Sequence, residues 1–283
     1  MKAGQKINMK YLIIGAGGTG GVTGYYMKKA GKDVTLIARG EHLKKIQKQG
    51  LTLEKMWDKT EENISIPATD MEHYAEHPDV IFVCVKGYSL QETIPFIKRI
   101  ARKNTIVIPV LNIYGTGGKM QKELPDLLVT DGCIYVSANI KEPGKLLQHG
   151  QILHIVFGVR DKAEFRPELK EIQKDLCDSH IDGTLSENIR REALEKFSYV
   201  SPIGAAGLYY HATAADFQKE GEARELFKIM VKEIAALAEA MGVPFQKDMA
   251  EVNLKNSFPT SHRKQPLPCS GISWQENSPK LTD

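Results

Sequence analysis

The chain has few cysteines, and they form no pattern that would bind a metal or pair in disulfides. Four cysteines are scattered over 283 residues without a C-x-x-C pair, a usage typical of proteins in a reducing cytosol. No apolar run is as long as a membrane span, and the N-terminus lacks the apolar segment of a signal peptide. We therefore expect a cytoplasmic protein with no disulfide and no membrane partner.

The chain also has little net charge of either sign. The formal net charge is +3, with 42% hydrophobic and 26% charged residues, an ordinary composition whose small positive excess does not indicate nucleic acid as a partner. His73 and His77 have helical spacing, but the glutamate of H-E-x-x-H is missing and Pro78 follows, so we predict no metal site. The sequence shows no Ser-His-Asp or Cys-His arrangement and no internal repeat.

Glycines, by contrast, gather near the start of the chain. Residues 10–20 read KYLIIGAGGTG, a strand-like apolar run followed by Gly15, Gly17 and Gly20 at G-x-G-x-x-G spacing. The first glycine permits a tight turn, the second lets a pyrophosphate approach the backbone, and the third lets helix and strand pack closely. A helix-compatible run and a second strand at 34–38 follow, so we predict a dinucleotide site rather than an ordinary glycine-rich turn. Its predicted contacts are Gly15, Ala16, Gly17, Gly18, Thr19 and Gly20.

The end of that second strand indicates which dinucleotide binds. NAD sites place Asp or Glu about twenty residues beyond the glycines, where it binds the ribose 2′-hydroxyl. This chain has Arg39 there and no carboxylate beside it, which favours NADP (NADPH); a solvated arginine is the alternative. Lys44, Lys45 and Lys48 follow, either as added positive charge or as the exposed face of a helix.

Two later strands end in polar residues. Residues 79–86 and 105–111 are apolar runs typical of parallel strands covered on both faces, and they lead into Lys86 and Asn112. Ligands bind outside the carboxyl ends of parallel strands, so both residues are candidates to meet cofactor or substrate, a solvated lysine being the alternative for Lys86. Further strands are predicted at 131–137, 144–150 and 151–159, with a hairpin turn at Gly150-Gln151.

Beyond Ser186, the predicted N-cap, the sequence is helical up to residue 249. Lys196 lies roughly 75° from the centre of the first apolar stripe, at the boundary between core and water. Partial desolvation there would lower the pKa of the amine and make it a better proton donor; a snorkelling lysine is the alternative. A long helix at 221–241 has an apolar face that is core or a dimer contact. That face comprises Leu226, Ile229, Met230, Ile234, Leu237 and Met241.

These patterns predict an α/β protein in which a Rossmann-type doubly wound sheet is followed by an all-helical C-terminal domain. We divide the chain into a leader at residues 1–8, an NADP-binding domain at 9–185, a helical substrate or dimer domain at 186–255 and an aberrant tail at 256–283.

Five stretches together resemble the ketopantoate reductase (2-dehydropantoate 2-reductase) family: GAGGTGG at 15–21, TLIARG at 35–40, VCVKGY at 83–88, the Asn112 loop and NIRREALEKF at 188–197. The resemblance covers residues 9–249. It implies NADPH-dependent reduction of a 2-oxo acid, ketopantoate to pantoate in pantothenate biosynthesis. It also implies that Lys86 and Asn112 line the cofactor and substrate cleft, and that Lys196 gives its proton to the 2-keto oxygen.

The chain departs from the family pattern at the substrate positions. Two asparagines that hold the substrate in the family correspond here to Val200 and Gly204, and the asparagine-glycine pair of the earlier loop reads Asn112-Ile113. A reductase of a different 2-oxo acid is therefore one alternative. A catalytically disabled dinucleotide-binding protein is another.

The tail departs most. The family continues with S-S-M-x-x-D, a catalytic glutamate in T-E-I-D and a final helix, whereas this chain reads NSFPTSHRKQPLPCSGISWQENSPKLTD. In a shifted reading frame with permitted codons from His262 onward, these residues can give PEATASMQRDIVAGEFTEIDG, which contains both motifs in order. We hypothesise a frameshift, in the gene or in the recorded sequence, that leaves the tail disordered and apolar surface of the helical domain exposed. DNA codons that cannot yield this peptide would exclude it.

Overall fold

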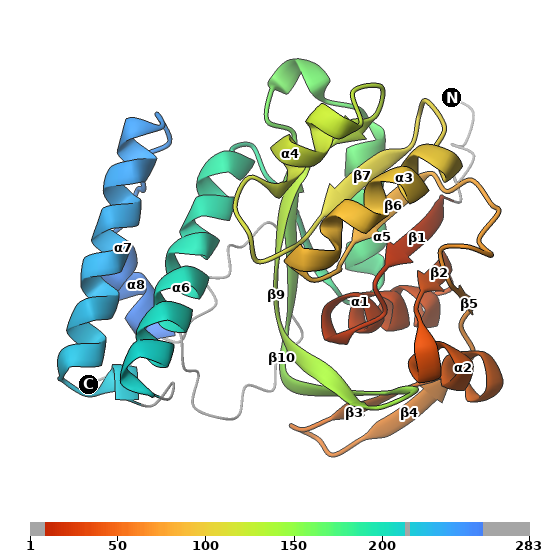
Figure 1. The fold of residues 1–283 in the computed structure, drawn as a ribbon, viewed down its shortest axis with the longest axis horizontal. Helices are drawn as coiled ribbons and strands as arrows, with labels where there is room; N and C mark the ends of the chain where they lie inside the picture. Colours follow the sequence, from red (N-terminus) through yellow and green to blue (C-terminus); the bar gives the residue numbers. More distant parts are fainter. Residues whose placement is uncertain (1–8, 213–215, 257–283) are drawn as a thin grey trace.

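A six-stranded parallel sheet forms the N-terminal half of the computed structural model, which describes residues 9–212 and 216–256. Its strand order is β5-β2-β1-β6-β7-β8, the order of a doubly wound dinucleotide-binding sheet. The Rossmann-type fold is thereby confirmed (Figure 1). The strands are β1 (Lys10–Ile14), β2 (Asp33–Ile37), β5 (Ala68–Thr69), β6 (Val80–Val83), β7 (Ile106–Pro109) and β8 (Leu128–Val129).

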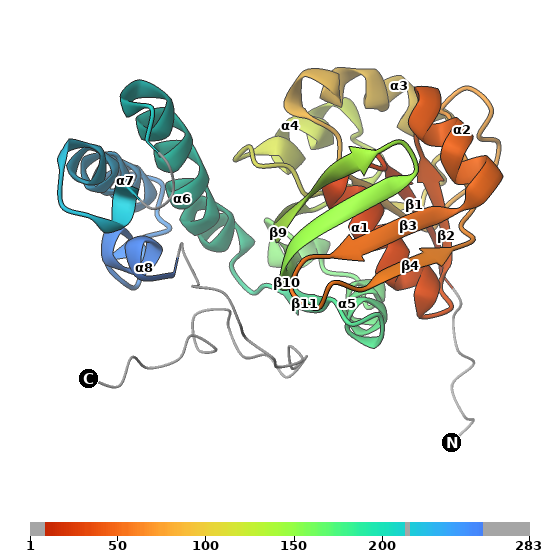
Figure 2. The same cartoon turned by 90° about the horizontal axis from the view of Figure 1, so that it is seen from below.

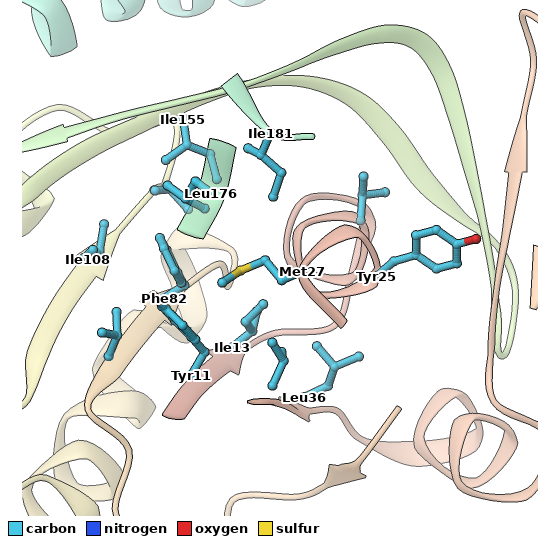
Figure 3. Close-up of a cluster of buried hydrophobic side chains, with 14 of the residues drawn as sticks. Tyr11, Ile13, Tyr25, Met27, Leu36, Phe82, Ile108, Ile155, Leu176 and Ile181 are labelled. Atoms are coloured by element: carbon cyan, nitrogen blue, oxygen red, sulfur yellow. The ribbon is translucent and has the colours of Figure 1, made fainter. Parts of the chain in front are cut away.

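Helices cover both faces of this sheet because its strands are apolar on both sides. Tyr11 and Ile13 point into one core with α1 and α5, while Leu12 and Ile14 point into the other with α3 and α4. Figure 3 shows the first core, where Tyr11 and Phe82 of the sheet lie opposite side chains of α1 and α5. The helices are α1 (Gly18–Lys29), α2 (Gly40–Gln49), α3 (Leu90–Ile100), α4 (Thr116–Glu123) and α5 (Glu168–Asp178).

A second sheet contains a long hairpin that runs between the parallel sheet and the C-terminal helices (Figure 1). The predicted hairpin turn at Gly150-Gln151 is wrong, because β10 continues through these residues and the turn lies before Lys145, at Gly144 with φ +82°. The pairing register of β10 with β9 shifts between Gln148 and Leu153. In the sequence, such an irregularity within one strand interrupts the alternating pattern and can be mistaken for a turn between two strands. The strands are β3 (Leu51–Lys55), β4 (Glu61–Ile64), β9 (Asp131–Glu142), β10 (Lys145–Gly158) and β11 (Asp182–Leu185).

Between residues 189 and 256, as far as the structure describes them, three α-helices form a separate layer beside the hairpin (Figure 2). The first begins two residues later than predicted, because Asn188 is the N-cap and its side chain accepts the N–H of Arg191 at 3.3 Å. Ser186 instead accepts the N–H of Asn188 and donates to Glu192. The helices are α6 (Ile189–Tyr210), α7 (Glu222–Ala240) and α8 (Met249–Asn256).

The helical layer presents apolar side chains to solvent. On α7 the buried residues are Phe227, Val231 and Ala238, whereas Ile229 and Leu237 of the predicted apolar face are 54% and 49% exposed. These two residues of the predicted apolar face therefore lie outside the core. The predicted leader and the tail beyond residue 256 lie outside the described residues. No helix in the described part is long and apolar enough to cross a membrane.

Candidate active site

The glycine loop between β1 and α1 has the tight geometry that its spacing predicts. Gly15 has φ +102°, and the N–H groups of Gly15 and Ala16 both donate to the carbonyl of Ile37 at 3.1 Å. A Cβ on Gly20 would lie 2.2 Å from the Gly15 carbonyl oxygen. Only glycine therefore fits at either position, the first for its backbone angle and the second for the close approach of helix to strand.

The N-terminus of α1 is free of capping and acidic side chains, as a binding site for an anion requires. Gly17 precedes the helix, which has no side-chain cap and no acidic residue in its first turn. A Cβ on Gly17 would meet no protein atom within 4 Å, so the space in front of the helix is free. Thr19 lies in the first turn, half-buried. The unpaired N–H groups of such a turn and the helix dipole suit a phosphate, so these residues fit a dinucleotide.

Arg39 lies at the edge of this loop. It follows β2 by two residues and is the N-cap of α2, and the loop N–H groups are bonded to Ile37 at the end of the same strand. Its side chain is exposed and makes no ion pair with the described part of the chain. Lys44, by contrast, pairs with Glu41 at 2.7 Å on the exposed face of α2. Arg39 thus presents a positive charge to solvent beside the end of β2, where the glycine loop is anchored.

His42 holds the glycine loop in place, a role that no sequence pattern indicated. Its Nδ1 accepts the N–H of Gly144 at 2.9 Å, so its Nε2 carries the proton and donates to the carbonyl of Ala16 at 2.9 Å. Burial lowers the pKa of His42 and favours this neutral form. The imidazole thereby ties the loop to the turn between β9 and β10, whose residue lies 102 positions away.

A small cleft lies between the 111–117 loop, the start of β9 and α6. It brings together Asn112 and Lys196, two of the predicted site residues. Lys86 is not among its lining residues; it is exposed and begins the 87–89 turn, where a Cβ on Gly87 would lie 2.4 Å from Ile113 of the neighbouring loop. The larger apolar and aromatic side chains of the remaining lining are Leu111, Ile113, Tyr114, Phe197 and Val200. Two polar residues also line it: Thr116, whose hydroxyl donates to the Ile113 carbonyl at 2.7 Å, and Asp131, which pairs with Arg160 at 3.4 Å.

Lys196 is half-buried on the side of α6 that faces β9. Its Nζ lies 4.2 Å from the ring centroid of Tyr135 and 5.8 Å from that of Tyr199. Burial lowers the pKa of Lys196 to about 8, with a small opposing effect of Cys133. It forms no ion pair with a carboxylate in residues 9–212 or 216–256. An amine of this kind is a proton donor suited to neutral pH.

The doubly wound sheet, the open helix start and a lysine of lowered pKa in a nearby cleft are the features of a Rossmann-fold oxidoreductase. Residues 11–162 match the family profile described as "Ketopantoate reductase PanE/ApbA", and residues 188–266 match that of its C-terminal domain. The chain belongs to the ketopantoate reductase family. Residues 267–283 lie outside both matches.

Curated relatives match the chain at low identity. The chain is 30% identical to 2-dehydropantoate 2-reductase of Pyrococcus horikoshii over 208 residues, which are 70% of this chain and 64% of that protein. It is 20% identical to the uncharacterized oxidoreductase YkpB of Bacillus subtilis over 255 residues, which are 90% and 82% of the two chains.

Solved structures share the fold. The crystal structure of 2-dehydropantoate 2-reductase from Porphyromonas gingivalis matches with a TM-score of 0.77 at 24% identity, covering 87% of each chain. The structure of D-mandelate dehydrogenase with NADH and anilino(oxo)acetate also has a TM-score of 0.77, at 20% identity over 87% of this chain and 79% of that one. The fold is thus shared by enzymes whose names refer to different substrates.

Proposed function

We propose that the protein is an NADPH-dependent reductase of a 2-oxo acid, with ketopantoate to pantoate as the first candidate reaction. The observation that carries the proposal is Lys196, whose amine of lowered pKa lines the same cleft as Asn112. Membership of the ketopantoate reductase family supports the reaction type. The scattered cysteines are consistent with a cytoplasmic location.

The side chains of the cleft can perform the proton transfer. The reduced nicotinamide, when bound, supplies the hydride to the 2-keto carbon. The Lys196 ammonium donates a hydrogen bond to the keto oxygen and gives it a proton as negative charge develops there. Asn112 can hold the substrate by its amide, and Lys86 at the neighbouring strand end adds positive charge for anionic groups. The glycine loop and the α1 N-terminus would hold the pyrophosphate of the cofactor.

Arg39 should select the phosphorylated cofactor. Arg39→Ala is expected to weaken NADPH binding by about 10- to 100-fold, because a hydrogen bond to a charged group contributes about 1.5–3 kcal/mol. NADH, which lacks the 2′-phosphate, should bind the variant as well as it binds the wild type. Fluorescence titration of both cofactors measures the two dissociation constants.

Lys48→Ala is the matched control, since it removes an exposed positive charge from the helix that Arg39 begins. It should change neither constant by more than a few-fold, because exposed charges at a distance are largely screened. An unchanged NADPH to NADH ratio in Arg39→Ala would exclude the 2′-phosphate assignment.

A second candidate is the reduction of a 2-oxo acid whose side chain is apolar. Val200, Ile113 and Phe197 line the cleft, and Gly204 lies on an exposed part of α6 outside that lining. These residues offer no side-chain hydrogen bond to a substrate hydroxyl. Apolar side chains in a pocket discriminate only about 100-fold against an added hydroxyl. The protein should therefore prefer the apolar 2-oxo acid but still reduce the hydroxylated one slowly.

NADPH oxidation by the purified protein decides between the candidates. Ketopantoate is compared with 3,3-dimethyl-2-oxobutanoate, which lacks only its hydroxyl, and with phenylglyoxylate. Higher kcat/KM for ketopantoate supports the first candidate, and higher values for the apolar acids support the second. NADPH binding without turnover of any of them would contradict both and support a disabled dinucleotide-binding protein.

A further inference from the structure

The strand that faces α6 carries an aromatic ring beside the lysine. Cys133 and Tyr135 lie two residues apart on β9 and therefore project from the same face of the strand. The Nζ of Lys196 is 4.2 Å from the centroid of the Tyr135 ring and 5.8 Å from that of Tyr199. An ammonium within about 6 Å of a ring face is attracted by the negative charge of that face.

We propose that Tyr135 is a positioning residue whose ring face holds the Lys196 ammonium at the wall of the cleft, in place of a carboxylate counter-ion. The position follows from the fold: the ring comes from the hairpin and the amine from the helical layer, so the contact is made only when the two are packed together. Its consequence for catalysis rests on the proposed function. The contact itself does not.

A buried histidine stacks on the Tyr135 ring. His154 is the cross-strand neighbour of Tyr135 in the β9–β10 pair, and the two rings stack with centroids 5.4 Å apart at an interplanar angle of 17°. His154 is 4% exposed, and its Nε2 lies 3.0 Å from Oγ1 of Thr184 on β11. This stacking favours the orientation in which the face of the tyrosine ring, and not its edge, is presented to the ammonium.

Two opposing effects act on the charge of Lys196. Burial favours the neutral amine, whereas the ring face favours the ammonium. The apolar contacts between α6 and α7 involve other side chains of α6, among them Leu194 and Ile203. The titratable groups around Lys196 in the described chain come from three elements. They are Asp131, Cys133 and Tyr135 of β9, His154 of β10, and Glu192, Glu195 and Tyr199 of its own helix.

Fluorination of the ring tests the proposal without changing its size. Phenylalanine and its mono-, di- and trifluoro derivatives are placed at position 135, since each fluorine weakens the negative ring face. Lysine labelled with carbon-13 at Cε is titrated by NMR, and Lys196→Arg identifies the resonance. We expect Tyr135→Phe to match the wild type, and the pKa of Lys196 to fall stepwise with fluorination by about one unit in total.

The same series at Tyr199 is the matched control, because its centroid is 5.8 Å from the amine, and its effect should be much smaller. A pKa of Lys196 that does not follow fluorination at position 135 would overturn the proposal. Should the fluorinated proteins not fold, Tyr135→Leu compared with Tyr135→Phe gives the same test, with a lower pKa expected in the leucine variant.

The pH profile of kcat separates this inference from the proposed function. If the pKa of Lys196 falls with fluorination and the basic limb of kcat moves down with it, both stand. If the pKa falls and the basic limb stays in place, the ring holds the ammonium but Lys196 is not the proton donor. A merely structural role of Tyr135 would lower stability and leave the pKa unchanged.

Discussion

Lys196→Ala is expected to lower kcat by about 10²- to 10⁴-fold, the range over which a positioned general acid acts. The affinity for NADPH should change little, because the glycine loop and Arg39 lie on the other domain, at the ends of β1 and β2. Single-turnover kinetics with saturating cofactor measures the chemical step, and titration of the cofactor in the absence of substrate measures its binding.

The pH dependence of kcat in the wild type tests whether Lys196 acts as a proton donor. Burial lowers the pKa of Lys196 to about 8, and only the ammonium can donate a proton. The value of kcat should therefore fall as the pH rises through about 8, and this limb should be missing from the residual activity of Lys196→Ala. An unperturbed lysine would place the limb about two units higher.

Lys119→Ala is the matched control, since it removes an exposed lysine from α4, next to the loop that lines the cleft. Its kcat should remain within a factor of two of the wild type. Equal losses of kcat and of NADPH affinity in Lys196→Ala would contradict a specific role in proton transfer, because they would indicate damage to the whole site.

Local signals were enough to predict the dinucleotide fold. The strand before Gly15, the spacing to Gly20 and the strand that ends before Arg39 all lie within one short βαβ unit, where backbone angles and close packing leave few residue types open. The apolar runs of β6 and β7 likewise predict strands covered on both faces. Because the ends of such runs are visible in the sequence, Lys86 and Asn112 could be assigned to strand ends.

The surroundings of Lys196 could not be predicted in this way. Helical periodicity placed the amine at the edge of the core, but its neighbour Tyr135 comes from a strand about sixty residues earlier, and no local pattern encodes that pairing. His42 is a similar case, because both of its partners are backbone groups. The break assigned at Gly150 failed for a different reason: glycine within a strand looks like a turn when the irregular pairing around it is unknown.

The second large effect is expected at a buried pair next to Tyr135. His154 and Asp182 are opposite each other on the parallel strands β10 and β11, with side chains 6% exposed and Nε2 3.8 Å from Oδ2. Burial, and then the charge of Lys196, lower the pKa of His154 to about 4. Burial raises the pKa of Asp182 to about 6. Near neutral pH the histidine is neutral, and the aspartate takes up its proton earlier than usual on acidification.

The two shifts affect stability in opposite directions. Between pH 6.5 and 4 the unfolded chain protonates His154 and the folded chain does not, so this residue lowers the free energy of unfolding by about 3 kcal/mol as the pH falls. Between pH 6 and 3.8 the folded chain protonates Asp182 before the unfolded chain does, so this residue raises it by about 3 kcal/mol. In the wild type the two contributions nearly cancel.

Replacing one residue of the pair should therefore produce a pH dependence of the free energy of unfolding that is cancelled in the wild type. Relative to the wild type at each pH, Asp182→Asn should lose about 2–3 kcal/mol of stability between pH 6.5 and 4.5, and His154→Asn should gain a similar amount. The double variant should run parallel to the wild type. Urea unfolding at several pH values measures all four proteins, and subtraction of the wild type removes the contribution of the other carboxylates. The prediction would be wrong if the free energy of unfolding of both single variants followed the same pH dependence as that of the wild type. Neither His154 nor Asp182 would then have a shifted pKa in the folded protein.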